Sequence, residues 1–265
     1  MKIIIDNVSV SELKSWFTGY VRSFKSSDKE LQQNINLKVS HTKRVCTQIK
    51  NIGKKLGLSE DESALAELIA LLHDIGRFEQ ISRYKTYNDS ISEDHAELGI
   101  KVLQEHGILN RFENSIQDVI RCAIKNHNKK SLPVDVNERC LFFTKLLRDA
   151  DKLDILKVVT SYYLGKNRKE NGMVILNLPD TPGISMEVYD ALINRKTVDI
   201  KVIRNLNDFK LLQVGWIYDI NFQPAVDIIR ESKYLEMIRE VLPESKEINK
   251  IFDIINSIAS QTSIT

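Results

Sequence analysis

Histidines are scarce in this chain of 265 residues, which contains only 5 of them. His73 and Asp74 stand side by side near the end of an apolar run, Ala70-Leu71-Leu72-His73-Asp74-Ile75-Gly76-Arg77. Burying such a pair without partners is costly, and a metal ion removes that cost because it takes neutral imidazole and ionised carboxylate as ligands. A buried histidine bonded to backbone is the alternative, so the other histidines must decide between the two.

Three more histidines and an aspartate fall on other predicted helices. His41 lies near the apolar stripe of the segment 29–56, and His95 opens a short helix. His127 ends the helix that contains Val119, Ile120, Ala123 and Ile124, and Asp151 lies inside a strongly apolar helix. Helical bundles build metal sites in this way, from single side chains on several facing helices. The pattern therefore predicts a metal site in the core of a bundle.

The aspartate of this set has two competitors, Asp149 and Asp154. Asp149 is about 200° around the helix from Asp151, so both cannot face one metal. The spacing alone leaves the choice open, and Asp154 also suits a supporting role behind a ligand.

The order His41, His73-Asp74 and Asp151, with Ala-Asp-Lys-Leu around the last residue, resembles the HD-domain superfamily of metal-dependent phosphohydrolases. His-Asp-Ile-Gly-Arg at 73–77 is similar to that family's His-Asp-Ile-Gly-Lys/Arg signature. His95 and His127 resemble the dinuclear branch, which includes HD-GYP-type phosphodiesterases and some nucleotide hydrolases. The resemblance covers roughly residues 35–160 and favours Asp151 as the last ligand.

The resemblance implies a metal centre with two divalent cations, for which Mn²⁺ or Fe²⁺ is favoured over Mg²⁺, Co²⁺ or Ni²⁺. Its implied ligands are His41, His73, Asp74 and Asp151 for one metal, with Asp74 bridging to a second metal held by His95 and His127. Two such ions stabilise attacking and leaving oxygens and lower the pKa of a water to about 7.

Two basic residues that follow expected ligands, Arg77 and Lys152, are candidates to bind the substrate phosphate. Arg77 has a fixed fork of donors suited to a phosphate oxygen, with a surface salt bridge as the alternative, and Lys152 is a weaker candidate. The side chains of Tyr84 and Tyr87 can either stack on a base of the substrate or fix their loop to the core. His106 stands at a helix end, where its ring is expected to interact with free backbone carbonyls rather than with a metal.

The chain departs from the HD-GYP pattern after His127. Asn128 stands where a second histidine would be expected, and the sequence continues Lys129-Lys130-Ser131-Leu132-Pro133 without Gly-Tyr-Pro. A cyclic dinucleotide substrate is therefore not supported. The leading hypothesis is hydrolysis of a phosphomonoester or phosphodiester bond, in a nucleotide, by a metal-activated water. The alternatives are a dinuclear-iron oxygenase and a catalytically inactive module that binds metal and nucleotide.

Composition limits the partners. Lys and Arg (38) nearly balance Asp and Glu (36), for a net charge of +2, which argues against bulk nucleic-acid binding and leaves a small phosphate-bearing substrate or a second copy of the chain. No apolar stretch approaches the length that spans a bilayer. The 3 cysteines, Cys46, Cys122 and Cys140, are scattered, which favours unpaired thiols in a reducing cytoplasm.

The apolar periodicity is helical throughout, and only 10 Gly and 5 Pro interrupt it. It predicts an all-α fold, a single HD-domain bundle with a helical C-terminal extension. The expected parts are an N-terminal helix (1–28), the metal-binding domain (29–164) and an extension packed on the same core (165–265). Expected helices cover 9–25, 29–56, 59–76, 93–105, 112–127, 137–164, 185–194, 206–219, 222–241 and 245–260, with a short strand at 2–5, a structured loop at 77–92 and an irregular excursion at 165–183.

Overall fold

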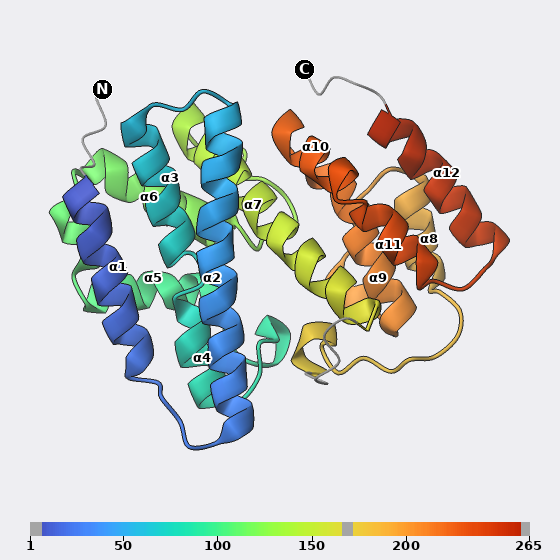
Figure 1. Ribbon diagram of the computed structural model, residues 1–265, viewed down its shortest axis with the longest axis horizontal. Coiled ribbons are helices and arrows are strands. Elements are labelled where there is room, and N and C mark those ends of the chain that lie inside the picture. The colour runs from blue at the N-terminus through green and yellow to red at the C-terminus, as the bar shows by residue number, and fades with distance from the viewer. Residues whose placement is uncertain (1–6, 166–171, 261–265) are drawn as a thin grey trace. The chain divides into compact units, whose positions relative to one another are not determined.

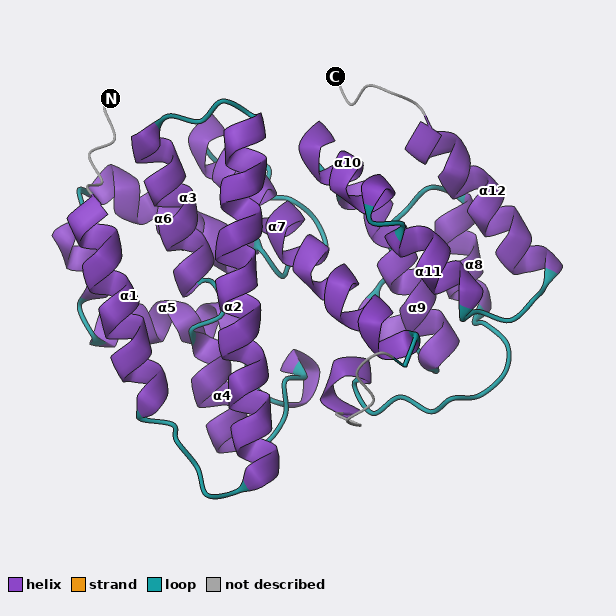
Figure 2. Cartoon of the chain, viewed as in Figure 1, coloured by secondary structure: helices purple, strands orange, loops and turns teal. Residues whose placement is uncertain are grey.

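The computed structural model describes residues 7–165 and 172–260, and every regular element within these ranges is a helix (Figures 1 and 2). The all-α prediction is therefore confirmed. The strand expected at 2–5 lies outside the described residues, as does part of the excursion at 165–183. No described helix has both the length and the apolar character required to cross a bilayer.

The chain divides into two compact units, Met1–Asp154 and Ile155–Thr265, and the boundary falls inside a long helix, α7 (Glu138–Tyr163). The predicted divisions after residues 28 and 164 stay a prediction. The first unit contains the beginning of α7, two 3₁₀ turns (Asp89–Ile91 and Ile108–Arg111) and six complete helices: α1 (Asn7–Arg22), α2 (Lys29–Lys55), α3 (Glu60–Leu72), α4 (Gly76–Tyr84), α5 (His95–Glu105) and α6 (Asn114–Asn126).

Helices α2 and α3 pack closely together and begin with strong local signals. Asp28 caps α2 by accepting hydrogen bonds from the backbone N–H groups of Glu30 and Leu31. Ser59 and Glu62 form a reciprocal capping box at the start of α3, as their spacing predicts. α3 then buries every residue from Ala64 to Leu72 except Glu67. Each fully buried leucine there stabilises the fold by about 1.5–3 kcal/mol.

The segment after His73 differs from the prediction. Residues 77–92 were expected to form a loop after a helix closed by Gly76, but α3 ends at Leu72 and Gly76 begins α4. Phe78 and Ile81, three residues apart, are fully buried and give α4 its apolar face. Gly76 is required for a different reason, because a Cβ there would collide with the backbone of α5.

The second unit contains α8 (Met186–Ile193), α9 (Leu206–Val214), α10 (Gln223–Glu231), α11 (Tyr234–Glu240) and α12 (Lys246–Ser260). Its 3₁₀ turns are Gly172–Ile175, Ile200–Val202 and Gly215–Asp219. The helix expected over 222–241 is split in two, because Lys233 adopts a left-handed conformation with φ 54°. All of α9 is buried, and its fully buried Asp208 accepts hydrogen bonds from Ser185 and from the backbone N–H of Arg204.

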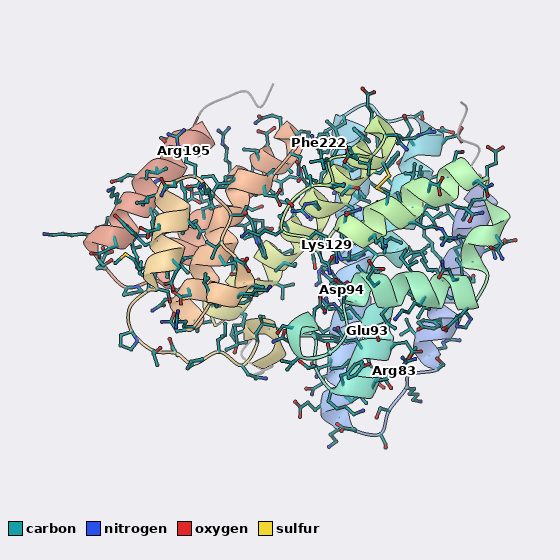
Figure 3. All side chains as sticks on the ribbon, turned by 180° about the vertical axis from the view of Figure 1, so that it is seen from behind. Arg83, Glu93, Asp94, Lys129, Arg195 and Phe222 are labelled. Carbon is teal, nitrogen blue, oxygen red and sulfur yellow. A yellow bond between two sulfur atoms is a disulfide. The ribbon has the colours of Figure 1, made fainter. Side chains whose placement is uncertain are left out.

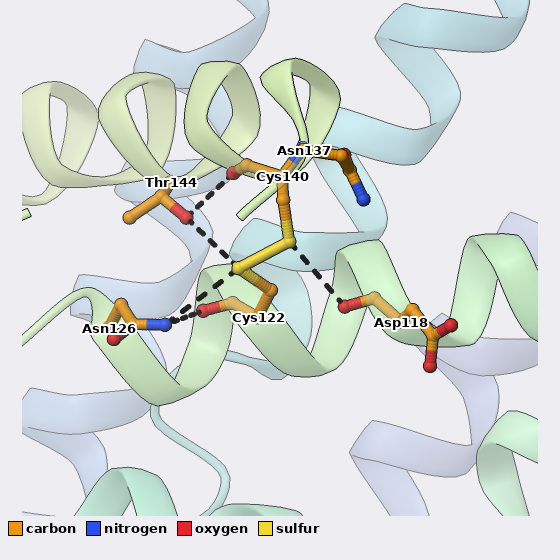
Figure 4. The surroundings of a disulfide bond; sticks show 6 residues. All are labelled: Asp118, Cys122, Asn126, Asn137, Cys140 and Thr144. Carbon is orange, nitrogen blue, oxygen red and sulfur yellow. Dashed lines mark hydrogen bonds between the residues drawn. A yellow bond between two sulfur atoms is a disulfide. The ribbon is translucent and has the colours of Figure 1, made fainter. Parts of the chain in front are cut away.

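Two of the cysteines are paired. Cys122 of α6 and Cys140 of α7 form a disulfide with their Cα atoms 5.9 Å apart, and Cys46 is free and buried (Figure 4). This corrects the expectation of unpaired thiols. The sequence indicated that both residues face inward on apolar helices, but only the packing of α6 against α7 brings them together. The disulfide also removes the cysteine argument for a reducing compartment.

The disulfide makes a direct prediction. Denatured but unreduced protein should present one reactive thiol, from Cys46, and reduction should raise the number to three. Because the bond closes a loop with a sequence separation of 18, reduction should lower the free energy of unfolding by about 3 kcal/mol. Thiol titration and chemical denaturation measure both effects, and three reactive thiols before reduction would contradict the pairing.

Candidate metal centre

The four histidines singled out from the sequence meet in one buried cluster, and each ring is fixed through its Nδ1 atom. The acceptors are Asp154 Oδ2 for His41 (2.7 Å), Ala70 O for His73 (2.7 Å), Asp89 Oδ2 for His95 (2.7 Å) and Ile124 O for His127 (2.6 Å). A ring whose Nδ1 donates to oxygen presents its Nε2 lone pair to the other side. The four rings therefore all offer Nε2 to a common space.

Asp74 lies between these nitrogens and divides them into two pairs. Its Oδ2 atom lies 3.5 Å from His41 Nε2 and 3.6 Å from His73 Nε2. Its Oδ1 atom lies 3.4 Å from His95 Nε2 and 3.9 Å from His127 Nε2. Each carboxylate oxygen thus faces one pair of imidazoles, which is the arrangement expected of a carboxylate shared by two cations.

Asp151 adds a second carboxylate beside the first pair. Its Oδ1 atom lies 3.1 Å from His41 Nε2 and 3.9 Å from His73 Nε2. Among the described residues, the groups of ligand atoms that lie within 4.8 Å of one another include Asp151 and neither Asp149 nor Asp154. Asp154 instead binds His41 Nδ1 and receives two hydrogen bonds from Arg44, of 2.5 and 3.0 Å.

The polar atoms of this cluster fit a divalent metal. The Nε2 atoms of His41 and His73 are buried and have no hydrogen-bond partner. The Nε2 atoms of His95 and His127 lie 3.0 Å apart, and with both Nδ1 atoms donating elsewhere neither can supply a proton to the other. Such facing lone pairs are unfavourable in a buried site unless a cation lies near them. Imidazole and carboxylate together suit divalent transition metals.

The electrostatics of the cluster keep most of the imidazoles neutral. Burial lowers the pKa of His73 and that of His95. The pKa of His127 is lowered to about 3, first by burial and then by the neighbouring rings of His95 and His73. His41 differs: its burial and Lys38 disfavour the charged form, but the neighbouring carboxylates of Asp151 and Asp154 raise its pKa overall.

The two inward carboxylates are held ionised. Burial opposes the charge on Asp74, but Lys38, His73 and Arg77 lower its pKa well below the usual range. Burial likewise opposes the charge on Asp151, and the neighbouring His41 lowers its pKa. Apart from His41, these side chains therefore already favour the protonation states that a metal needs.

Hydrogen bonds at helix ends position two of the ligands, His95 and His127. Asp94 caps α5, and Lys129 and Asn128 hold its carboxylate at 2.6 and 3.1 Å; Asp94 and Lys129 lie close together in Figure 3. At the end of α6, Arg148 NH1 donates to the carbonyls of Asn126, His127 and Lys129 at 3.1, 3.2 and 2.5 Å. Arg148 thus fixes the turn that carries His127.

Arg77 lies beside Asp74, and its guanidinium is fixed to the neighbouring loop. Its NH1 donates to Gln80 Oε1, Tyr87 O and Asp89 Oδ1 at 2.7, 2.6 and 2.9 Å. Its Nε atom lies 3.5 Å from Asp74 Oδ1 and makes no hydrogen bond. Asp89 therefore joins Arg77 to the Nδ1 of His95, a connection that the sequence analysis missed.

The structure also places the other residues that the sequence singled out, which are Tyr84, Tyr87, His106 and Lys152. Tyr87 is buried and donates a hydrogen bond to Asn34 O at 2.8 Å, which fixes its loop, whereas Tyr84 is 44% exposed. The ring of His106, at the end of α5, packs against Trp16 and Tyr20. Lys152 is buried.

Residues 39–156 match the family model of the HD domain, and this range includes all six predicted ligands. These residues form an HD domain. Comparison of the chain with curated proteins and with solved structures finds no significant match. The family assignment therefore depends on the family model and on the His/Asp cluster.

Asp154→Asn should weaken metal binding by the HD domain without removing a ligand. The change removes the negative charge that orients His41 through Nδ1 and pairs with Arg44, and loss of such support costs about 10- to 100-fold in metal affinity. Mn²⁺ titration of metal-free protein measures the effect. Asp135→Asn, which alters an exposed carboxylate, is the matched control, and equal affinities in the two variants would contradict the role of Asp154.

The HD domain without metal should lose stability as the pH falls below about 6.5. His127 has its pKa lowered to about 3 when folded, against about 6.5 in an unfolded chain, so the unfolded state binds more protons between these values. For this group alone the loss from pH 7 to pH 4.5 is on the order of 2 kcal/mol. Denaturation of chelator-treated protein should show a shallower pH dependence for His127→Gln, and identical slopes would contradict the assignment.

Proposed function

We propose that this protein is a metal-dependent phosphohydrolase that cleaves a phosphomonoester or phosphodiester bond of a small substrate, a nucleotide, with water as nucleophile. The observation that carries the proposal is the division of the ligand atoms around Asp74. One carboxylate oxygen faces His41 and His73, and the other faces His95 and His127. A carboxylate placed in this way can bind two cations, and two neighbouring cations stabilise both the attacking and the leaving oxygen of a hydrolysis.

We assign His41, His73, Asp74 and Asp151 to the first position, and Asp74, His95 and His127 to the second. The ligand atoms of His41, His73 and Asp74 lie within 4.8 Å of one another, as do those of Asp74, His95 and His127, which supports the division. Asp151 Oδ1 lies 3.1 Å from His41 Nε2, although its ligand atom also groups with those of His73 and His127. Two divalent cations bound there, with Mn²⁺ or Fe²⁺ favoured by the imidazole-rich set, would supply Lewis-acid activation of a water and of the phosphate oxygens.

The protein's own side chains have separate tasks in this reaction. Asp74 would be a ligand to both cations, because each of its oxygens faces one pair of imidazoles. Arg77 is fixed by three acceptors on NH1 and presents its Nε beside Asp74, so it is placed to bind a phosphate oxygen with little loss of side-chain freedom. The lowered pKa of His127 keeps that ligand neutral at any physiological pH.

Metal content and phosphate release test the proposal together. Purified protein should contain about two metals per chain and release phosphate from members of a nucleotide panel when Mn²⁺ is added. His73→Ala and Asp74→Asn should abolish both, while far-ultraviolet circular dichroism shows the helices retained. His106→Ala, which alters a histidine packed against Trp16 outside the cluster, should keep both metals and the activity.

The alternatives give different results in the same experiment. Two irons with substrate-dependent oxygen uptake and no phosphate release would indicate a dinuclear-iron oxygenase. Tight nucleotide binding without turnover would indicate a regulatory module. Turnover retained in either cluster variant would contradict the proposed site.

A further inference from the structure

Lys38 is a cation of the cluster that the sequence analysis did not single out. It lies on α2 three residues before His41, so both side chains leave the helix on the same face. Its Nζ atom donates to Asp74 Oδ2 at 2.8 Å. This is the same oxygen that faces His41 and His73 and that would bind the first cation.

The pair differs from an ordinary surface salt bridge. The side chain of Asp74 is 3% exposed and that of Lys38 is 17% exposed. An ionised carboxylate so deeply buried requires a compensating charge, and Lys38 is the strongest of the neighbours that lower its pKa. Lys38 thus supplies, in the metal-free protein, part of the positive charge that a metal would bring.

Lys38 is also the more movable of the two cations beside Asp74. Arg77 is fixed by three hydrogen bonds from NH1. Within the described part of the chain, Lys38 Nζ donates one hydrogen bond, to Asp74. The same Nζ lies 5.4 Å from the centre of the Tyr87 ring, which is held in place through its hydroxyl group. The ring gives the ammonium group a favourable neighbour at a second position, and its partial exposure gives it access to solvent.

We propose that Lys38 is an exchangeable counter-ion: it neutralises Asp74 in the metal-free site and, once cations occupy that site, binds an anionic oxygen of the substrate phosphate. The inference rests on the proposed function and adds a specific residue to it. Two divalent cations beside Asp74 repel an ammonium group, whereas a phosphate bound to them brings negative charge back within its reach. No bond is made or broken at Lys38 in this exchange.

The exchange predicts effects of opposite sign on two ligands. Lys38→Met removes a positive charge a few ångströms from the first cation, so Mn²⁺ should bind metal-free protein about tenfold more tightly. The same variant, saturated with Mn²⁺, should bind inorganic phosphate about tenfold more weakly, because a charge-assisted hydrogen bond is lost. A merely structural role for Lys38 would weaken both or neither.

Isothermal titration of each variant with Mn²⁺, and of Mn²⁺-loaded protein with inorganic phosphate, measures both affinities. Lys38→Gln should behave like Lys38→Met and provides a second neutral variant of different shape. Lys38→Arg keeps the charge and should bind both ligands nearly as the wild type does. Lys43→Met removes an exposed lysine from the same helix and should leave both affinities unchanged.

The outcomes separate this inference from the proposed function. Wild-type protein that binds no Mn²⁺ would overturn both. Normal Mn²⁺ binding by the wild type, with neutral Lys38 variants that bind Mn²⁺ no more tightly or bind phosphate equally well, would overturn the exchange alone. Tighter Mn²⁺ binding together with weaker phosphate binding would support it.

Discussion

Burial of the Asp74 carboxylate is the constraint on which the rest of the first unit depends. At 3% exposure, its negative charge cannot be hydrated, and burying an unpaired ion costs several kcal/mol even after relaxation. Its two oxygens are compensated separately, Oδ2 by Lys38 at 2.8 Å and Oδ1 by Arg77 Nε at 3.5 Å. One cation comes from α2 and the other from α4, so these helices must keep their positions for the carboxylate to remain ionised.

The helix ends solve a related problem for the imidazoles. A helix leaves its last carbonyls without intrahelical partners, and His73 and His127, which directly follow α3 and α6, use carbonyls three residues earlier as Nδ1 acceptors. The same backbone geometry therefore satisfies the helix end and turns Nε2 toward the centre. His95 uses Asp89 in the same role, and His41, in the middle of α2, uses Asp154.

The sequence predicted most of the helices and the four histidines that the structure brings together, because a histidine within an apolar helical pattern must find a polar partner or a metal once it is buried. It did not predict α4, since charged residues such as Arg77 and Arg83 hide the spacing of Phe78 and Ile81. It missed Lys38, Asp89 and Arg148, whose roles depend on contacts between segments distant along the chain. The pairing of Cys122 with Cys140 was missed for the same reason: the apolar periodicity predicts which face of a helix is buried, but not which other helix packs against that face.

Because Asp74 contributes one oxygen to each proposed position, the two positions cannot be independent. A rotation of the carboxylate that favoured His41 and His73 would draw Oδ1 away from His95 and His127, at present 3.4 and 3.9 Å away. The rigid support described above opposes such rotation: Arg77 is tied to Asp89, and Asp89 is tied to His95. This closed chain of contacts links the carboxylate to the second pair of imidazoles, so displacement of any member disturbs both positions together. The segment from Arg77 to His95, of which the sequence predicted residues 77–92 as a structured loop, therefore fixes the Asp74 carboxylate relative to His95.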